Sequence, residues 1–277
     1  MQEKDSLYQG FYINLERSVQ RREAVEQQLT ESGLAGKYQR FPAIDGSAIT
    51  YGPDAARGTT ILGCILSHLS VIKSQIGKNL HIHVLEDDAV LHHDIARVFE
   101  NFVKLKQDDE WDILMTDIFL PPDVYLFKYL HERYQKLSAA GSISFLDIGS
   151  WEFAGASSYF VNKRSMERFL QMMEHAFPPE TPYDLRIREL AKRGKLKVFV
   201  CFPFFSTVSE LSSDSTISGS FTHVLPLTEY RRAFYVSADR EAIAHDLEAY
   251  CTEDADTFTR IYLNLVRCLA SPQHVAF

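Results

Sequence analysis

The sequence has few cysteines, no long apolar run and no excess of positive charge. Its four cysteines are scattered and form no C-x-x-C pair, which excludes a disulfide framework and a cysteine-rich zinc site. The longest stretch without a charged residue, 58–72, has 15 residues and contains two serines and a histidine, so it is too short and too polar to cross a bilayer. With 29 lysines and arginines against 37 aspartates and glutamates, the net charge of −8 argues against a nucleic-acid-binding protein. An anionic ligand must therefore be bound locally, by a few arginines or by a metal ion.

The length and the N-terminus narrow the class further. The 277 residues suffice for one large α/β domain with a substantial core, and no repeat or low-complexity tract indicates a solenoid or a disordered chain. The first five residues, Met-Gln-Glu-Lys-Asp, are acidic and are not followed by the apolar core of a secretory signal. We therefore expect a cytoplasmic protein with reduced thiols.

Short apolar segments alternate with segments of helical periodicity from the N-terminus to about residue 202. The predicted strands are 7–15, 38–44, 81–85, 111–115, 143–148, 157–161 and 197–202. The predicted helices are 18–32, 60–76, 95–103, 124–137, 163–174 and 184–193. This alternation predicts an α/β fold, with a Rossmann-like, mainly parallel sheet and helices on both faces. Beyond residue 225 only helical patterns remain, at 240–250 and 254–269, so we divide the chain into a main domain, 1–224, and a helical C-terminal extension, 225–277.

Three consecutive acids, Glu86, Asp87 and Asp88, directly follow the strand predicted at 81–85. In open α/β sheets, ligands bind at the carboxyl ends of the strands. Adjacent carboxylates repel each other, and a hard divalent cation such as Mg²⁺ or Mn²⁺ removes that repulsion. Because side chains alternate along a strand, Glu86 and Asp88 can share one ion while Asp87 points elsewhere. A solvated acidic turn explains the triplet equally well, so the residues alone leave both interpretations open.

Histidines close to these acids suggest a different metal centre. His81 and His83 alternate on the same predicted strand, and His92-His93 follows soon after. Together with the acids they could form the centre of a zinc or iron hydrolase. Ordinary core or surface histidines are the alternative.

Four motifs occur in order within residues 11–88. They are Ile13-Asn14-Leu15-x-Arg17 with Arg21-Arg22, Phe41-Pro42-Ala43-Ile44-Asp45-Gly46, Gly63-Cys64-x-Leu66-Ser67-His68 and Leu85-Glu86-Asp87-Asp88. With these motifs the chain resembles glycosyltransferase family 25, the family of lipooligosaccharide and collagen galactosyltransferases. The similarity continues with Gly155-Ala156-x-x-Tyr159, Pro182-Tyr183-Asp184 and Ser213-Asp214, and it ends near residue 225.

The resemblance implies a GT-A type fold, a nucleotide-sugar donor and a divalent cation. In the family the acidic triplet stands in for a D-x-D motif, and here Glu86 occupies its first position. We expect Glu86 and Asp88 to bind Mn²⁺ or Mg²⁺, which would stabilise the charge that develops on the departing diphosphate. The expected reaction transfers a hexose, galactose from UDP-galactose, with inversion, onto a lipooligosaccharide or LPS-type oligosaccharide.

The proposed site residues fall into two groups. For the catalytic base we favour Asp184, which follows a Pro-rich loop and opens a predicted helix, although a plain N-cap is an equal alternative. Weaker candidates for the base are Asp147, Glu152 and Asp214. The residues expected to bind the nucleotide sugar are Asn14, Arg17, Arg21, Asp45, His68, Asp87 and Gly155. Several of these could instead be turn residues or solvated helix charges. His223 is a hypothetical third metal ligand.

Two other functions stay open: a metal hydrolase built from His81 and His83 with Glu86–Asp88, and an inactive relative that only binds a sugar nucleotide. A lipid-linked acceptor would bring the protein to the inner face of the inner membrane. Residues 224–277 carry five arginines, no lysines and eight acids, which argues against polybasic attachment to anionic lipid. We expect the C-terminal helices to pack on the main domain or on a second copy in a homodimer.

Overall fold

The computed structural model describes residues 6–49, 55–120, 123–175, 177–178, 180–209, 230–239 and 241–243, together with 245, 260 and 264. The strands of the main sheet are β1 (Tyr8–Asn14), β2 (Tyr38–Pro42), β3 (His81–Glu86), β5 (Ile113–Met115), β6 (Ser144–Asp147), β7 (Ser158–Val161) and β8 (Val198–Phe202). The helices are α1 (Val19–Glu31), α2 (Ala55–Gln75), α3 (Ile95–Leu105), α4 (Val124–Ala139), α5 (Met166–His175) and α6 (Tyr183–Lys192), with two short 3₁₀ helices, η1 (Ala35–Lys37) and η2 (Gly46–Ala48). All of these strands and α-helices were predicted from the sequence to within a few residues.

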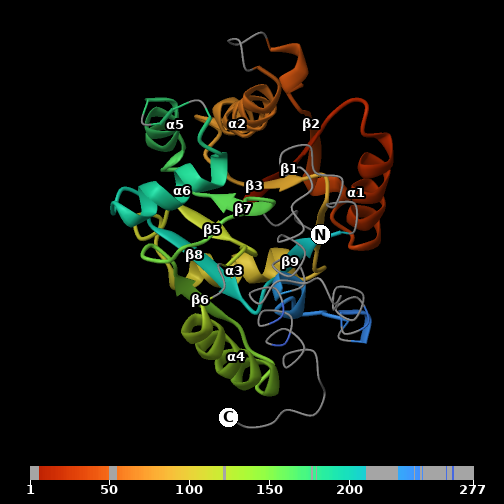
Figure 1. The fold of residues 1–277 in the computed structure, drawn as a ribbon, viewed down its shortest axis with the longest axis vertical. Helices are drawn as coiled ribbons and strands as arrows, with labels where there is room; N and C mark the ends of the chain where they lie inside the picture. Colours follow the sequence, from red (N-terminus) through yellow and green to blue (C-terminus); the bar gives the residue numbers. More distant parts are fainter. Residues whose placement is uncertain are drawn as a thin grey trace.

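The seven strands form one sheet in the order β2-β1-β3-β7-β5-β8-β6 (Figure 1). Strands β1, β2, β3, β5 and β8 run in the same direction, while β6 and β7 run opposite to them. The mainly parallel sheet is therefore confirmed. A second, two-stranded sheet pairs β4 (Ala89–Leu91) with β9 (Ser206–Val208), and the sequence did not predict it.

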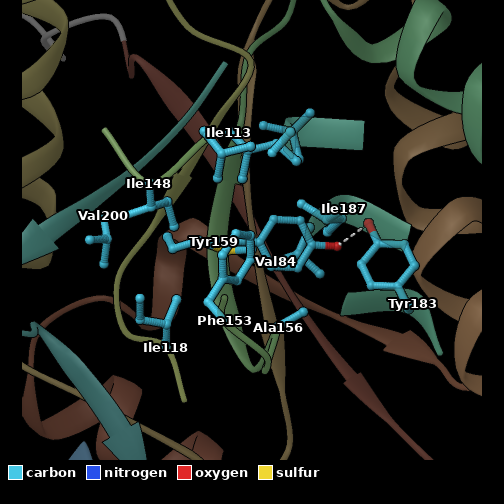
Figure 2. Packing of buried hydrophobic residues seen from close by; sticks show 14 of the residues in the cluster. Val84, Ile113, Ile118, Ile148, Phe153, Ala156, Tyr159, Tyr183, Ile187 and Val200 are labelled. Carbon is cyan, nitrogen blue, oxygen red and sulfur yellow. Dashed lines mark hydrogen bonds between the residues drawn. The ribbon is translucent and has the colours of Figure 1, made fainter. Parts of the chain in front are cut away.

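Alternating side chains divide the interior into two cores, one on each face of the sheet. On β3, Ile82 and Val84 belong to the larger core, in which α2, α4, α5 and α6 pack, while Leu85 belongs to the core under α1 and α3. Figure 2 shows part of the larger core, with Val84 of β3 and Tyr183 and Ile187 of α6. Figure 1 shows α2, α5 and α6 together on one side of the sheet. Fully burying one such aliphatic side chain contributes roughly 1.5–3 kcal/mol. Helices on both faces, as predicted, are thus confirmed.

Part of the predicted C-terminal extension is built into the larger core. Tyr230 stacks on Phe127 with ring centroids 5.0 Å apart, and the backbone N–H of Phe204 donates to the carbonyl of Phe234 at 2.9 Å. The boundary at residues 224 and 225 stays a prediction, and the helices expected at 240–250 and 254–269 lie mostly outside the described residues. Within the described residues, no helix is both long enough and apolar enough to cross a bilayer.

Candidate active site at the carboxyl edge of the sheet

A cavity of about 510 Å³ opens where the parallel strands β1, β2 and β3 end. The segments that follow these strands form its walls together with one face of α2. Among the lining residues are Arg17, Arg21, Asp45, Cys64, His68, Glu86, Asp87 and Asp88. Its size is typical of small-molecule sites, and its place is the usual ligand edge of an open α/β sheet.

The motifs at residues 41–46 and 63–68 pack against each other and form one wall of the cavity. Ser67 on α2 accepts a hydrogen bond from the backbone N–H of Ile44 at 2.8 Å and donates to the carbonyl of Gly63 at 2.7 Å. A Cβ atom at position 63 would lie 2.8 Å from the carbonyl oxygen of Ile44 and 2.7 Å from the backbone nitrogen of Gly46. The loop can therefore approach the helix this closely only because residue 63 is glycine.

Asp45 and Arg17 meet at the outer end of this wall. The Asp45 carboxylate accepts the backbone N–H of Ser47 at 2.9 Å and forms an ion pair with Arg17. Hydrogen bonds from Ser47, and then the Arg17 charge, hold the pKa of Asp45 below its usual range. Asp45 is thus both a turn residue and a residue of the cavity.

Asp87 is held by residues of the first motif. Its Oδ2 accepts from the Asn14 side-chain amide at 2.7 Å, and its Oδ1 accepts from Arg21 at 3.0 Å. Asn14 is 1% exposed, and its side-chain oxygen accepts from Arg40 at 3.0 Å, which fixes its orientation. Asp87 is therefore bound on the β1 side of the cavity, through both of its oxygens.

Glu86 and Asp88 differ from Asp87 in the contacts that their carboxylates make. One oxygen of Glu86 lies 3.2 Å from His68 Nε2. Burial raises the pKa of Glu86, but His68 and the charges of Arg231 and Arg21 outweigh that effect, so the pKa lies below its usual value. Burial, and then repulsion from Glu86, raise the pKa of Asp88 to about 7.

The Asp88 carboxylate retains a free binding site. Its Oδ1 is buried and has no hydrogen-bond partner in the part of the chain that the structure describes, although such groups normally have one. An unpartnered carboxylate oxygen next to a second carboxylate fits a hard divalent cation. Cys64, His68 and Glu86 also offer ligand atoms within 4.8 Å of one another, a thiol-containing set that suits zinc.

A hydrogen bond joins Asp184 and Gly155, neither of which lines the cavity. The second residue of α6, Asp184, accepts the backbone N–H of Gly155 at 2.7 Å. Burial raises the pKa of Asp184, and hydrogen bonds from the backbone of Gly155 and Leu185 only partly offset this. Since Pro182 occupies the N-cap position, Asp184 joins two segments and does more than cap its own helix.

A chain of hydrogen bonds connects the start of α6 with the acidic residues. Tyr183 stacks on His68 with ring centroids 4.3 Å apart and hydrogen-bonds Tyr159 at 2.8 Å (Figure 2). Tyr159 hydrogen-bonds His68 Nδ1 at 2.9 Å, and His68 Nε2 contacts Glu86. Asp184, next to Tyr183, is therefore held close to the cavity although it does not line it.

The weaker base candidates lie elsewhere. Glu152 forms ion pairs with Lys192 and Arg188, and Asp147 accepts the backbone N–H of Gly149 at 2.9 Å. Asp214 and His223 lie outside the described residues, so their predicted roles stay predictions.

The alternative metal centre, which combined His81 and His83 with Glu86–Asp88, is wrong. His83 Nε2 hydrogen-bonds Ser158 at 3.0 Å, and its other ring nitrogen contacts Tyr38. Burial lowers the pKa of His83 to about 3, as expected for an imidazole that stays neutral in a core. Strand alternation places His81 and His83 on the face of β3 opposite to Glu86.

Sequence reasoning missed a buried ion pair at the same edge. Arg231 pairs with Asp117, just beyond β5, and donates to Ser157; the side chains of the pair are 1% and 0% exposed. Asp117 follows an apolar strand and could have been found as a second acid at a strand end, whereas nothing in the sequence marks Arg231.

Two buried hydroxyl groups near Asp88 were also missed. The backbone N–H of Ser209 donates to the carbonyl of Asp88 at 2.8 Å. Within the described residues, the hydroxyl oxygens of Ser209 and Thr207 have no hydrogen-bond partner. Neither residue belongs to a recognisable motif.

A carboxylate-lined cavity at the carboxyl edge of an open sheet defines an α/β protein with a small-molecule site. Residues 8–187 match the model of glycosyltransferase family 25, described as an LPS biosynthesis protein. The match covers more than half of the 277 residues, so this chain belongs to glycosyltransferase family 25.

Other comparisons add little. No curated protein matches the chain. Among solved structures, mouse xyloside xylosyltransferase 1 in its apo form is similar, with 14% sequence identity and a TM-score of 0.31. That match covers 69% of this chain and 64% of the other, so the chain spans less than two thirds of that structure's length.

Proposed function

We propose that the protein is a metal-dependent hexosyltransferase on a GT-A type fold. It transfers galactose from UDP-galactose, with inversion, onto an LPS-type oligosaccharide. The observation that carries the proposal is the cavity at the ends of β1, β2 and β3, in which Glu86 and Asp88 face the arginines that follow β1. A sugar nucleotide offers the two chemistries that this cavity matches, a diphosphate and polar hydroxyl groups.

The chemistry of the donor set supports a hard cation. Glu86 and Asp88 would hold Mn²⁺ or Mg²⁺, and the buried, unpartnered Oδ1 of Asp88 is the atom with a free position. A bound cation would stabilise the negative charge on the leaving diphosphate. Arg21, 3.7 Å from Asp88, and the partly exposed Arg17 supply positive charge at the same end of the cavity.

Asp184 is the proposed base. As the acceptor oxygen forms its bond to the anomeric carbon and the bond to the diphosphate breaks, the acceptor hydroxyl loses its proton to the Asp184 carboxylate. The raised pKa of Asp184 supports this role, because a carboxylate with a higher pKa is a stronger base. The hydrogen bond from Gly155 keeps the carboxylate in place.

The test is a donor screen with and without Mn²⁺, read as the release of free nucleoside diphosphate in the presence of an oligosaccharide acceptor. We expect release from UDP-galactose only when the metal is present, and loss of release in Glu86→Gln and Asp88→Asn. Glu132→Gln, an exposed acid on α4, is the matched control and should keep wild-type turnover. A folded protein that binds no nucleotide sugar would overturn the proposal, and binding without turnover would indicate an inactive relative.

Substitution of the base gives a separate prediction. Asp184→Asn should lower kcat by about 10²–10⁴-fold and leave UDP affinity unchanged, since the amide cannot take the proton. In the wild type, kcat should rise with pH through the raised pKa of Asp184, because only the ionised carboxylate is a base. Unchanged turnover in Asp184→Asn would exclude it as the base.

Membrane association and dimerisation are further proposals. A lipid-linked acceptor would place the enzyme at the inner face of the inner membrane. Light scattering of the intact chain tests the proposed homodimer.

A further inference from the structure

Arg231 lies at the centre of the sheet edge, although it is far from the site in the sequence. Its guanidinium forms an ion pair with Asp117, 114 residues away, and donates to the hydroxyl of Ser157. Arg231 lies beyond residues 8–187, the part that the family model matches. Burying an ion pair this completely is costly in free energy, so the pair needs a reason beyond stability.

On one side Arg231 is connected to the proposed metal ligands. Ser157, which accepts from the guanidinium through its hydroxyl, accepts the backbone N–H of Glu86 through its carbonyl oxygen at 2.8 Å. The position of the Glu86 backbone therefore depends on Ser157, and that of Ser157 depends on Arg231.

On the other side Arg231 is connected to the proposed base. Its guanidinium lies over the Phe119 ring, 4.5 Å from the ring centroid. Phe119 exchanges two backbone hydrogen bonds with Ala154, at 2.8 and 3.0 Å, and packs directly against Gly155. The backbone N–H of Gly155 then holds Asp184.

We infer that Arg231 is a positioning residue that fixes Glu86 and Asp184 relative to each other. The inference rests on the proposed function, in which these two carboxylates serve the donor and the acceptor. Arginine suits the role because its planar fork can bind Asp117 and Ser157 at the same time while its face covers Phe119. A C-terminal segment outside the matched part of the chain thereby completes the site.

The decisive variant removes both charges of the pair. Arg231→Met alone would leave the Asp117 carboxylate buried without a partner and could unfold the chain, whereas Arg231→Met with Asp117→Asn keeps the net charge and avoids that. Mn²⁺ affinity is measured by electron paramagnetic resonance without any donor, alongside kcat, UDP affinity and Tm. We expect the double variant to fold, to bind Mn²⁺ about tenfold more weakly and to lose at least tenfold in kcat.

The matched control is the ion pair at the other end of the same strand. Arg168 pairs with Asp112 just before β5, away from the cavity. Arg168→Met with Asp112→Asn should lower Tm and leave kcat and Mn²⁺ affinity at wild-type values. Arg231→Lys keeps the charge but not the planar guanidinium. Its kcat should lie between that of the double variant and that of the wild type.

The outcomes separate this inference from the proposed function. A wild-type protein that binds neither Mn²⁺ nor a nucleotide sugar refutes the proposed function. A wild type that binds both, together with a folded double variant that matches it in Mn²⁺ affinity and kcat, refutes the role of Arg231 alone. A double variant that loses only Tm, as the control does, also refutes it.

Discussion

Gly155 combines two constraints that no other residue type can meet. Its φ of +86° lies in the left-handed region, and a Cβ atom there would come within 2.8 Å of the Phe119 ring. The residue is thus required both for the turn and for the close approach of the Asp117–Phe119 segment.

Gly155→Ala should therefore impair stability and turnover together. Gly77→Ala is the matched control, because Gly77 has a φ of +83° and open space around the added methyl group. We expect the Gly77 variant to lose about 1 kcal/mol from backbone strain and to keep full turnover. The Gly155 variant should lose about 2–3 kcal/mol, and turnover should fall because the N–H that holds Asp184 moves. Urea unfolding and initial rates measure the two effects, and equal behaviour of the two variants would contradict this account.

His81 is a buried imidazole whose protonation opposes folding. Burial lowers its pKa to about 4, against partial compensation from Asp108. The unfolded chain, with a histidine pKa near 6.5, binds the proton more readily, so the stability that His81 provides is present above that value and is lost as the pH falls towards 4.

Comparing the wild type with a His81 variant separates the effect of His81 on the free energy of unfolding from that of the buried acidic residues. The gap in unfolding free energy between the wild type and His81→Gln should narrow by about 2 kcal/mol between roughly pH 7.5 and pH 5. Phe99→Leu, in the same core and in contact with His81, should show a gap that does not depend on pH. An equally constant gap for His81→Gln would show that the imidazole is not kept neutral by the fold.

Among the secondary-structure elements, α2 positions the Ala43–Ser47 wall of the cavity through one hydroxyl group, that of Ser67. Ser67→Ala should cost about 1 kcal/mol, because the partly buried N–H of Ile44 loses its acceptor. Nucleotide affinity should weaken several-fold as the Ala43–Ser47 wall loosens.

Ser74 on the same helix provides the control. Its hydroxyl also donates to a helix carbonyl, that of Val71 at 2.7 Å, but within the described residues it accepts no loop N–H. Calorimetric titration with UDP compares the two variants. Equal UDP affinity for Ser67→Ala and Ser74→Ala would contradict a role for Ser67 in the site.

The elements also show how far the sequence could predict the fold. Apolar runs identified every strand of the main sheet, but they cannot give a strand's direction, so the reversed β7 between β3 and β5 could not be predicted. Strands β4 and β9 have three residues each, too few for a recognisable period. Periodicity alone likewise gave no sign that Tyr230 and Phe234 pack in the main core.

For the site, a group of residues could be predicted from the sequence only when its members are neighbours along the chain. Glu86, Asp87 and Asp88 were found because three acids in a row after a strand need an explanation. The alternation that places Ile82 and Glu86 on one face already places His83 on the other, so the hydrolase constellation could have been excluded from the sequence. The Asp117–Arg231 pair joins positions 114 residues apart and could not be predicted without an alignment.

For the whole molecule, the relevant feature is the position of two arginines relative to the acidic triplet. The chain carries a net charge of −8, yet Arg21 and Arg231 are concentrated at the edge of the sheet that holds its acidic triplet. A chain with this net charge gives an anionic donor no long-range attraction, so under the proposed function donor binding depends on these local cations and on a metal ion.

Metal-dependent binding of the donor by Glu86 and Asp88 can be tested by calorimetric titration of UDP-galactose, with and without excess Mn²⁺, on the wild type and on Glu86→Gln with Asp88→Asn. We expect the wild type to bind the donor only when the metal is present, and the folded double variant to bind no donor under either condition. Equal donor affinity in the two proteins, or wild-type binding that is indifferent to Mn²⁺, would contradict it.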